Sequence, residues 1–312
     1  MSVIIPLYNE EQLIGRCLES VLKLRIPKEI IVVDDGSTDD SAVMVERYMN
    51  SGEVRLLRQE NKGVAEARNL GLSESRGDII AFADSDDYIV PESFERLYGK
   101  FLESGADMAR VGTIMIHLDG RRETREANST LVGETLTGRH CFAEMMRTNT
   151  FTPLVFCHLM KKTLIDSHGL RFRYRYSEDD LWTSIAMCLA ENVYVSDELH
   201  YVYCKKERSL TGQNLCSKLR ADSHLAVAKD LYGFLSSNHM AEDAQNWMCC
   251  KILYLTADAI KTYIAIGDTD FEVSASMYQD LMRRVLPSGD LHAKRVAYMF
   301  CKRIIDMVKG ML

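Results

Sequence analysis

The sequence of 312 residues has no apolar run of about 18 residues, the length at which a helix can cross a bilayer. It does not begin with a basic segment, an apolar stretch and a cleavage site, so neither a secretory leader nor a membrane span is expected. Nine cysteines occur, but they are scattered apart from Cys249 and Cys250, and none lies in a CxxC pair or at zinc-ligand spacing. We therefore expect reduced thiols, no structural zinc site and a cytoplasmic location.

An excess of positive charge is also lacking. Lys and Arg number 38 against 45 Asp and Glu, which gives a formal net charge of -7. Because a protein that coats nucleic acid usually has a basic domain, nucleic acid is not expected as a partner. The composition is that of an ordinary globular protein, with 46% hydrophobic and 27% charged residues. This length suits one large domain with an appendage, or two domains.

The first hundred residues alternate between apolar runs and helical patterns. Continuous β-branched runs at residues 2–6 and 29–33 predict strands that are buried on both faces. Helical spacing in residues 11–24 makes this a strand, helix, strand unit with a right-handed crossover. The alternation continues with helices at 39–49, 64–75 and 91–103 and strands at 54–57 and 78–82. We predict a doubly wound α/β sheet, which binds ligands at the carboxyl ends of its strands.

The pattern changes in the second half of the chain. We predict a strand at 107–116, a polar excursion at 117–150, a strand near Phe172, a helix at 181–189 and a strand at 193–195. From about residue 215 the strand signal ends, and three or four helices are expected. The predicted organisation is an α/β domain at 1–215, in two halves at 1–110 and 111–215, and a helical region at 216–312.

Three acidic clusters are expected to follow strands, at residues 34–39, 84–87 and 178–180. Helix capping or a solvated turn explains any single cluster. Three carboxylates within residues 84–87, however, repel one another unless a cation or hydrogen-bond donors compensate them. A Mn²⁺ or Mg²⁺ ion held by one or two carboxylates, water and phosphate oxygens fits that need. If all three clusters meet at one rim, Lys62 and Arg68 would supply positive charge for a phosphorylated ligand.

Four segments in order carry a family resemblance: VIIPLYN at 3–9, VDDGSTD at 33–39, GVAEARNLG at 63–71 and DSDD at 84–87. They resemble the successive signatures of the family 2 glycosyltransferases. EDDLW at 178–182 is similar to the later ED-x-x-W element of the family, which extends the resemblance to about residue 215. The resemblance implies a GT-A fold, a doubly wound mixed sheet with a helical C-terminal extension here.

The resemblance also implies that residues 1–215 form the catalytic domain, with a donor-binding half at 1–110, which holds a nucleotide-sugar site, and an acceptor half at 111–215. Pro6, Tyr8 and Glu10 would line the nucleobase pocket, with the Tyr8 ring against the base. Asp35 would hydrogen-bond uracil, and Arg68 would lie near the base or the diphosphate. A UDP-sugar is therefore the expected donor.

The later motifs imply the metal ligand and the base. Asp84 resembles the ribose-side residue of the DxD motif, with Ser85 beside it, and Asp86 resembles the ligand of a Mn²⁺ or Mg²⁺ ion that bridges to the diphosphate. Asp87 matches no fixed role. Asp179 occupies the position of the catalytic base, which implies transfer with inversion at the anomeric carbon.

The acceptor side and the last strand match less closely. Glu178 and Trp182 are expected on the acceptor side. Members of the family often carry a Tyr-Tyr-Tyr-Arg segment, but Cys204 stands here where Arg is common. Lys205 or Arg208 would then serve the diphosphate.

The expected function is transfer of a sugar to a hydroxyl of a glycan or lipid-linked acceptor, in the synthesis of a bacterial surface polysaccharide. Residues 294–309 are basic and amphipathic, which favours contact with the inner face of the cell membrane, although a helix packed on the protein explains them as well. A metal-dependent nucleotidyltransferase would need a Gly-rich basic loop where residues 7–10 read LYNE. A receiver-type signalling module and a catalytically silent nucleotide-sugar-binding protein remain alternatives.

Overall fold

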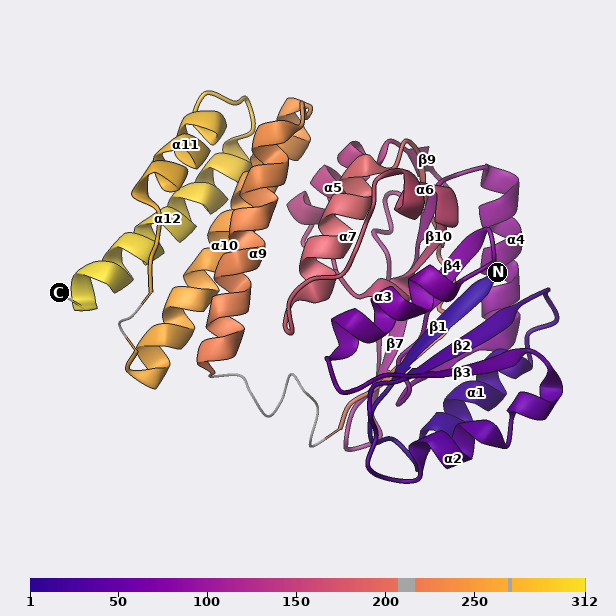
Figure 1. The fold of residues 1–312 in the computed structure, drawn as a ribbon. Helices are drawn as coiled ribbons and strands as arrows, with labels where there is room; N and C mark the ends of the chain where they lie inside the picture. Colours follow the sequence, from indigo (N-terminus) through magenta and orange to yellow (C-terminus); the bar gives the residue numbers. More distant parts are fainter. Residues whose placement is uncertain (207–216, 269–270, 312) are drawn as a thin grey trace. The chain divides into compact units, whose positions relative to one another are not determined.

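The structure is a computed structural model that describes residues 1–206, 217–268 and 271–311 (Figure 1). The chain divides into two compact units. Unit 1 comprises Met1–Thr137, Leu154–Arg173 and Leu189–Glu207, and unit 2 comprises Gly138–Pro153, Tyr174–Cys188 and Arg208–Leu312. The last segment of unit 2 begins near residue 215, where a boundary was expected. Unit 2 also includes two earlier segments of the chain.

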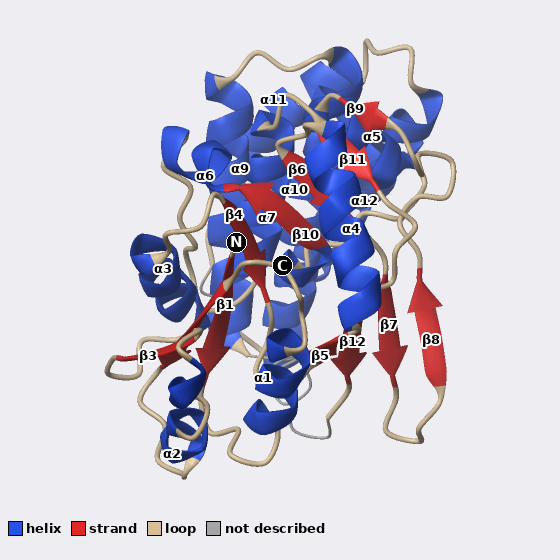
Figure 2. Cartoon of the chain, turned by 90° about the vertical axis from the view of Figure 1, so that its right-hand side faces the viewer, coloured by secondary structure: helices blue, strands red, loops and turns tan. Residues whose placement is uncertain are grey.

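Unit 1 is built on a mixed sheet in the order β3-β2-β1-β4-β10-β6-β11-β9 (Figure 2). Its parallel part pairs β1 with both β2 and β4, and β2 with β3. The apolar runs of β1, β2 and β4 are continuous because both faces of the sheet are covered there. The strands are β1 (Ser2–Leu7), β2 (Glu29–Asp34), β3 (Val54–Arg58), β4 (Ile79–Phe82), β6 (Met108–Arg110), β9 (Thr135–Leu136), β10 (His158–Lys161) and β11 (Val193–Val195).

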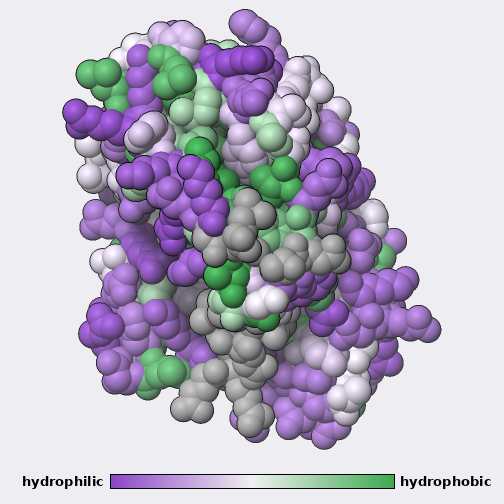
Figure 3. Space-filling view, turned by 90° about the vertical axis from the view of Figure 1, so that its left-hand side faces the viewer, coloured by the Kyte–Doolittle hydropathy of each residue, from purple (hydrophilic) through white to green (hydrophobic). Residues whose placement is uncertain are grey.

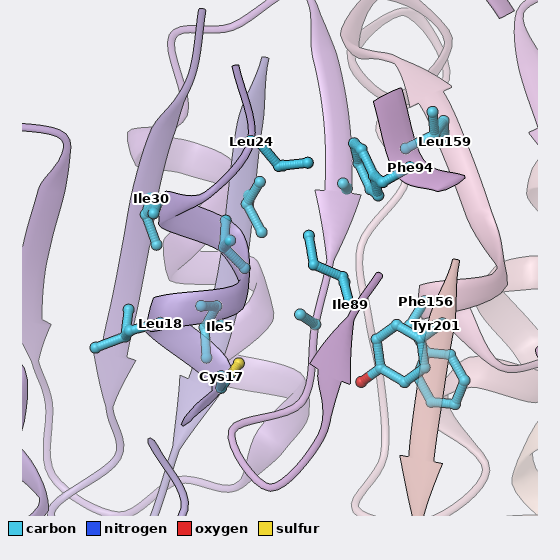
Figure 4. Packing of buried hydrophobic residues seen from close by; sticks show 14 of the residues in the cluster. Ile5, Cys17, Leu18, Leu24, Ile30, Ile89, Phe94, Phe156, Leu159 and Tyr201 are labelled. Atoms are coloured by element: carbon cyan, nitrogen blue, oxygen red, sulfur yellow. The ribbon is translucent and has the colours of Figure 1, made fainter. Parts of the chain in front are cut away.

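Helices cover this sheet. They are α1 (Ile14–Leu22), α2 (Ser41–Glu46), α3 (Val64–Glu74), α4 (Pro91–Ser104) and α6 (Lys162–Ser167), with short 3-10 turns η1 (Met49–Ser51) and η2 (Val155–Cys157). The apolar side of α1 contributes Cys17 and Leu18 to a core that includes Ile5 and Ile30 of the sheet (Figure 4). Helix α3 lies so close to β1 that a Cβ on Gly71 would be 2.4 Å from a methyl carbon of Ile4. This packing fixes the strand ends relative to the helices that follow them.

A second sheet in unit 1 has the order β5-β12-β7-β8. It contains β5 (Tyr88–Ile89), β7 (Thr113–Ile116), β8 (Arg122–Arg125) and β12 (Tyr201–Cys204). The single strand predicted at 107–116 is therefore two strands in different sheets. The chain changes sheet at Gly112, where an added Cβ would lie 2.5 Å from the carbonyl oxygen of Arg125.

Two other expectations about unit 1 need correction. Phe172 lies in no strand, and its ring packs edge-on against Phe82 with the centroids 5.4 Å apart. The antiparallel neighbour of β4 is instead β10, whose short apolar run carries no alternating pattern. The polar excursion expected at 117–150 contains β8, β9 and α5 (Gly138–Arg147), because cross-strand pairing orders the two strands and α5 buries Cys141, Phe142 and Met145.

Unit 2 is helical. Its helices are α5 (Gly138–Arg147), α7 (Glu178–Leu189), α9 (Lys218–Ser237), α10 (Glu242–Ile266), α11 (Ala275–Val285) and α12 (Leu291–Met311). The long helix α10 contacts α5, α9, α11 and α12 and is buried along most of its length (Figure 1). The described part of the C-terminal region thus contains four helices, in agreement with the sequence. None of the helices in the described ranges is long and apolar enough to cross a membrane.

Candidate active site

The carboxyl ends of β1, β2 and β4 meet at one edge of the main sheet, because these strands are parallel neighbours. Tyr8 follows β1, Asp35 follows β2, and the turn at 84–87 follows β4. The third acidic cluster does not end a strand. Residues 178–180 open helix α7 in unit 2, and α6 separates them from the preceding strand β10. The expectation that three strand ends gather the three clusters is therefore wrong for the third.

The end of β1 presents an aromatic ring to solvent. Pro6 is buried and pairs with Val33 of β2, whereas Tyr8 is 47% exposed. Asn9 follows with a positive φ of 52°, and its Oδ1 accepts the backbone N–H of Thr38 at 2.8 Å. This contact joins the loops after β1 and β2. An exposed ring on a braced loop can stack on a planar base.

Asp35 organises the loop that leads into α3. Its buried carboxylate accepts the side-chain amide of Gln59 at 2.7 Å and the backbone N–H groups of Lys62 and Gly63, both at 2.8 Å. The side chain of Lys62 is exposed, so its contribution to Asp35 is through the backbone. A carboxylate offers about four acceptor positions. Asp35 therefore has room for about one more donor, such as the N–H of a pyrimidine base.

Arg68 is buried beneath the acidic turn. One guanidinium nitrogen lies 2.9 Å from Asp84 Oδ1, and the guanidinium carbon lies 5.4 Å from the centre of the Phe172 ring. Loss of hydration raises the pKa of Asp84, and the positive charge of Arg68 opposes that rise. Arg68 thus balances the charge of Asp84 directly.

Asp87 connects the acidic turn to the second sheet. It is fully buried, accepts the backbone N–H of Cys204 at 2.7 Å and contacts the hydroxyl of Tyr201 at 2.9 Å. The backbone N–H of Asp84 donates to that same hydroxyl at 2.9 Å. Burial, together with the charges of Asp86 and Asp84, raises the pKa of Asp87 to about 9. Asp87, for which the motif implied no role, fixes the turn to β12, and Ser85 is buried in the same turn.

The Asp86 carboxylate contacts a lysine. Its Oδ2 lies 2.9 Å from the ammonium of Lys206, which also donates to the carboxylate of Glu10. Burial disfavours the charged lysine, but the hydrogen bond to Glu10 and the charge of Asp86 raise the pKa of Lys206 above its usual value. Burial also raises the pKa of Glu10, and Lys206 opposes that shift. Arg16 donates to the backbone oxygen of Asp86 at 2.5 Å.

Lys206 is the functional residue that sequence reasoning missed. The adjacent Lys205 was expected at the diphosphate, but its ammonium lies 3.4 Å from Nδ1 of His117. The second member of the Lys205–Lys206 pair is the one that reaches the acids. The pair itself, directly after β12, was the available signal. Arg208 lies outside the described residues.

The side chains at this edge of the sheet include few groups that could bind a divalent ion. Among the residues that the structure describes, no group of three or more His, Cys, Asp or Glu side chains could enclose a metal. Asp86 nevertheless supplies a carboxylate that already contacts a cation, the ammonium of Lys206. Mn²⁺ and Mg²⁺ bind through one or two carboxylates plus phosphate and water oxygens. Asp86 would be one such carboxylate ligand.

The expected base lies in unit 2. Glu178 and Asp179 are partly exposed in the first turn of α7, where negative charge is favourable. Asp179 Oδ1 accepts the backbone N–H of Asp180 at 2.9 Å, and Asp180 forms an ion pair with Lys251 of α10. Trp182 is only 1% exposed, so its packing supports α7.

Known proteins resemble this chain in sequence and in fold. Residues 2–181 match the family model described as Glycosyl transferase family 2. The glycosyltransferase EpsJ of Bacillus subtilis is 32% identical over 232 residues, which cover 72% of this chain and 66% of EpsJ.

Two solved structures are similar in fold. Staphylococcus aureus TarS (residues 1–349), in complex with UDP-GlcNAc, superposes with a TM-score of 0.66 at 22% identity, covering 98% of this chain and 88% of that one. The mannosyltransferase PcManGT of Pyrobaculum calidifontis, in complex with GDP-Man and Mn²⁺, gives a TM-score of 0.55 at 15% identity, covering 99% and 86%. The family resemblance and the GT-A fold expected from the motifs are thereby confirmed, and the chain belongs to the family 2 glycosyltransferases.

Proposed function

We propose that the protein transfers a sugar from a UDP-sugar to a hydroxyl of a glycan or lipid-linked acceptor, with inversion at the anomeric carbon. The observation that carries this proposal is the edge of the main sheet, where Tyr8, Asp35 and the turn at 84–87 follow neighbouring parallel strands. TarS, whose structure contains UDP-GlcNAc, is similar to this chain in sequence as well as in fold, and this supports a UDP-sugar donor.

The donor would be bound by residues of unit 1. The exposed ring of Tyr8 would stack on uracil, beside Pro6, and Asp35 would accept the N–H of the base. The turn that Arg68 and Asp87 brace would bring Asp86 to the diphosphate. Asp84 and Ser85 would lie on the ribose side, and Glu10, now paired with Lys206, would border the pocket.

When bound at Asp86, a divalent ion would supply positive charge that offsets the charge developing on the leaving UDP. Asp179 would accept the proton of the acceptor hydroxyl while that oxygen attacks the anomeric carbon. The bond between the anomeric carbon and the UDP oxygen breaks in the same displacement, and UDP leaves with the bonding electrons. Attack from the face opposite UDP inverts the anomeric configuration.

The acceptor and the cellular role are proposed from relatives. TarS of Staphylococcus aureus is described as a poly(ribitol-phosphate) beta-N-acetylglucosaminyltransferase and is 29% identical over 214 residues. We therefore assign this chain to bacterial surface polysaccharide synthesis on the cytoplasmic side of the membrane, with residues 1–215 as the catalytic part. Glu178 and Trp182 would shape the acceptor side through the start of α7.

Binding and hydrolysis of a panel of UDP- and GDP-sugars with Mn²⁺ test this proposal. We expect one UDP-sugar to bind in a metal-dependent way, and Asp86→Ala to weaken that binding by about tenfold or more. Asp179→Asn should retain binding and lose turnover by about 10²–10⁴-fold. Asp119→Ala, which changes an exposed acid in the turn before β8, is the matched control and should alter neither property.

Other outcomes would support a different donor or a different function. Binding of GDP-sugars alone would replace the donor class, as in the PcManGT complex with GDP-Man. Binding without turnover in the wild type would favour a catalytically silent protein. Release of pyrophosphate from a nucleoside triphosphate would favour the nucleotidyltransferase, and no nucleotide-sugar binding under any metal would overturn the proposal.

A further inference from the structure

Helix α12 has a buried face and an exposed face of different character. Ala293, Ala297 and Ile304 are at most 5% exposed, and α12 packs against α10 and α11. On the other face, large apolar side chains are exposed: Leu291 (68%), Tyr298 (63%), Met299 (53%) and Ile305 (51%). Figure 3 shows the side of the molecule that carries α11 and α12, where hydrophobic and hydrophilic side chains are interspersed.

The exposed residues form one stripe in which apolar and basic residues alternate. Leu291, Tyr298 and Ile305 recur every seven residues, and the exposed Arg295, Lys302 and Lys309 recur at the same interval between them. Successive members are three or four positions apart, so their side chains lie along one side of the helix. Two members of this stripe border a shallow depression, which is lined by Tyr298, Met299, Lys302, Arg303, Asp306 and Met307.

The charge of this face is opposite to that of the chain. The stripe carries three basic residues and no acid. Next to it, the exposed Arg303 and Asp306 contribute one positive and one negative charge. The whole chain has a formal net charge of -7. An anionic surface would therefore repel most of the protein but attract this face. A second copy of the same face would bring basic residues against basic residues, which disfavours a dimer here.

We propose that the outer face of α12 docks on the surface of a membrane that contains anionic phospholipid. Long Lys and Arg side chains keep their charges at the phosphate level, while the leucine, tyrosine and isoleucine between them enter the boundary with the acyl chains. The basic residues attract the headgroups, and the apolar ones add burial. This inference is independent of the sugar transferred, because it uses no residue of the donor site.

Co-sedimentation of the full chain with vesicles tests the proposal. Vesicles of phosphatidylglycerol and phosphatidylcholine should bind the protein, vesicles of phosphatidylcholine alone should not, and added salt should weaken binding. Reversing two charges, in Arg295→Glu/Lys302→Glu, should lower the partition coefficient by about 30-fold or more. The apolar variant Leu291→Ser/Ile305→Ser should lower it as well and leave the salt dependence in place.

The control is Lys23→Glu/Lys229→Glu, which makes the same change in net charge at two exposed lysines outside α12. It should retain most of the binding. The proposal is overturned if anionic vesicles do not bind the wild type, or if this control loses as much binding as the α12 variant. It is also overturned if light scattering finds a dimer that the α12 variants dissociate, because the face would then be an interface between copies. Unchanged circular dichroism will confirm that the variants fold.

Discussion

Replacing Lys206 by methionine removes the ammonium that Glu10 and Asp86 share, and it retains most of the aliphatic side chain. In the structure this ammonium lies 2.9 Å from Asp86 Oδ2 and donates to Glu10. A divalent ion bound by Asp86 would bring two positive charges next to the ammonium and would weaken its contact with Asp86. We therefore expect Lys206→Met to bind Mn²⁺ more tightly than the wild type in the absence of any nucleotide.

The size of the effect follows from the strength of the Lys206–Asp86 contact that the ion would weaken in the wild type. A hydrogen bond between charged groups contributes about 1.5–3 kcal/mol. The side chains of Lys206 and Asp86 are 23% and 25% exposed, so water screens part of their attraction, and the lower end of that range applies. Since about 1.4 kcal/mol corresponds to a factor of ten, the dissociation constant for Mn²⁺ should fall about tenfold.

Titration of the free protein with Mn²⁺, followed by calorimetry or by the electron paramagnetic resonance of the free ion, measures this constant directly. Lys205→Met is the matched control, because the neighbouring Lys205 ammonium lies 3.4 Å from Nδ1 of His117. Its Mn²⁺ affinity should equal that of the wild type. Equal or weaker Mn²⁺ binding by Lys206→Met would refute the reasoning, as would equal tightening in both variants.

Three further predictions concern stability, measured by urea unfolding. Lys251→Met leaves the mostly buried Asp180 without its ion-pair partner and should lower the free energy of unfolding by about 3 kcal/mol. Adding Asp180→Asn to the same chain should recover much of that loss, and a loss below about 1 kcal/mol would contradict the reasoning. Burial lowers the pKa of His200 to about 3, so the unfolded chain takes up a proton first as pH falls below about 6.5. The free energy of unfolding should therefore drop by about 2 kcal/mol between pH 7 and 5 on account of His200, a drop that His200→Gln should remove. Gly71→Ala should destabilise by about 1–3 kcal/mol, because its Cβ would lie 2.4 Å from an isoleucine of β1. Gly99→Ala, in α4 with open space around it, should instead stabilise slightly, and equal effects at the two glycines would exclude this explanation.

Much of the sheet edge where β1, β2 and β4 end could be predicted from the sequence. The apolar runs of β1, β2 and β4 are local patterns, and the motifs that follow them are contiguous, so both the strands and the turns could be located by residue number. Helices α1, α3 and α4 were predicted within three residues at each end for the same reason. Short strands were less predictable: β10 has four residues, and the strand expected near Phe172 does not form.

The sequence by itself determined which residues end the strands, because backbone preference and apolar spacing act over a few neighbouring residues. Only the tertiary structure decided which partner each charged side chain meets. Lys206 reaches Glu10 from 196 positions away, and Asp87 meets Cys204 from 117 positions away. Such pairs depend on how the second sheet packs beside the first, and side-chain charge alone does not specify one partner among many. The same reason explains why Lys206 contacts the acids while its neighbour Lys205 does not.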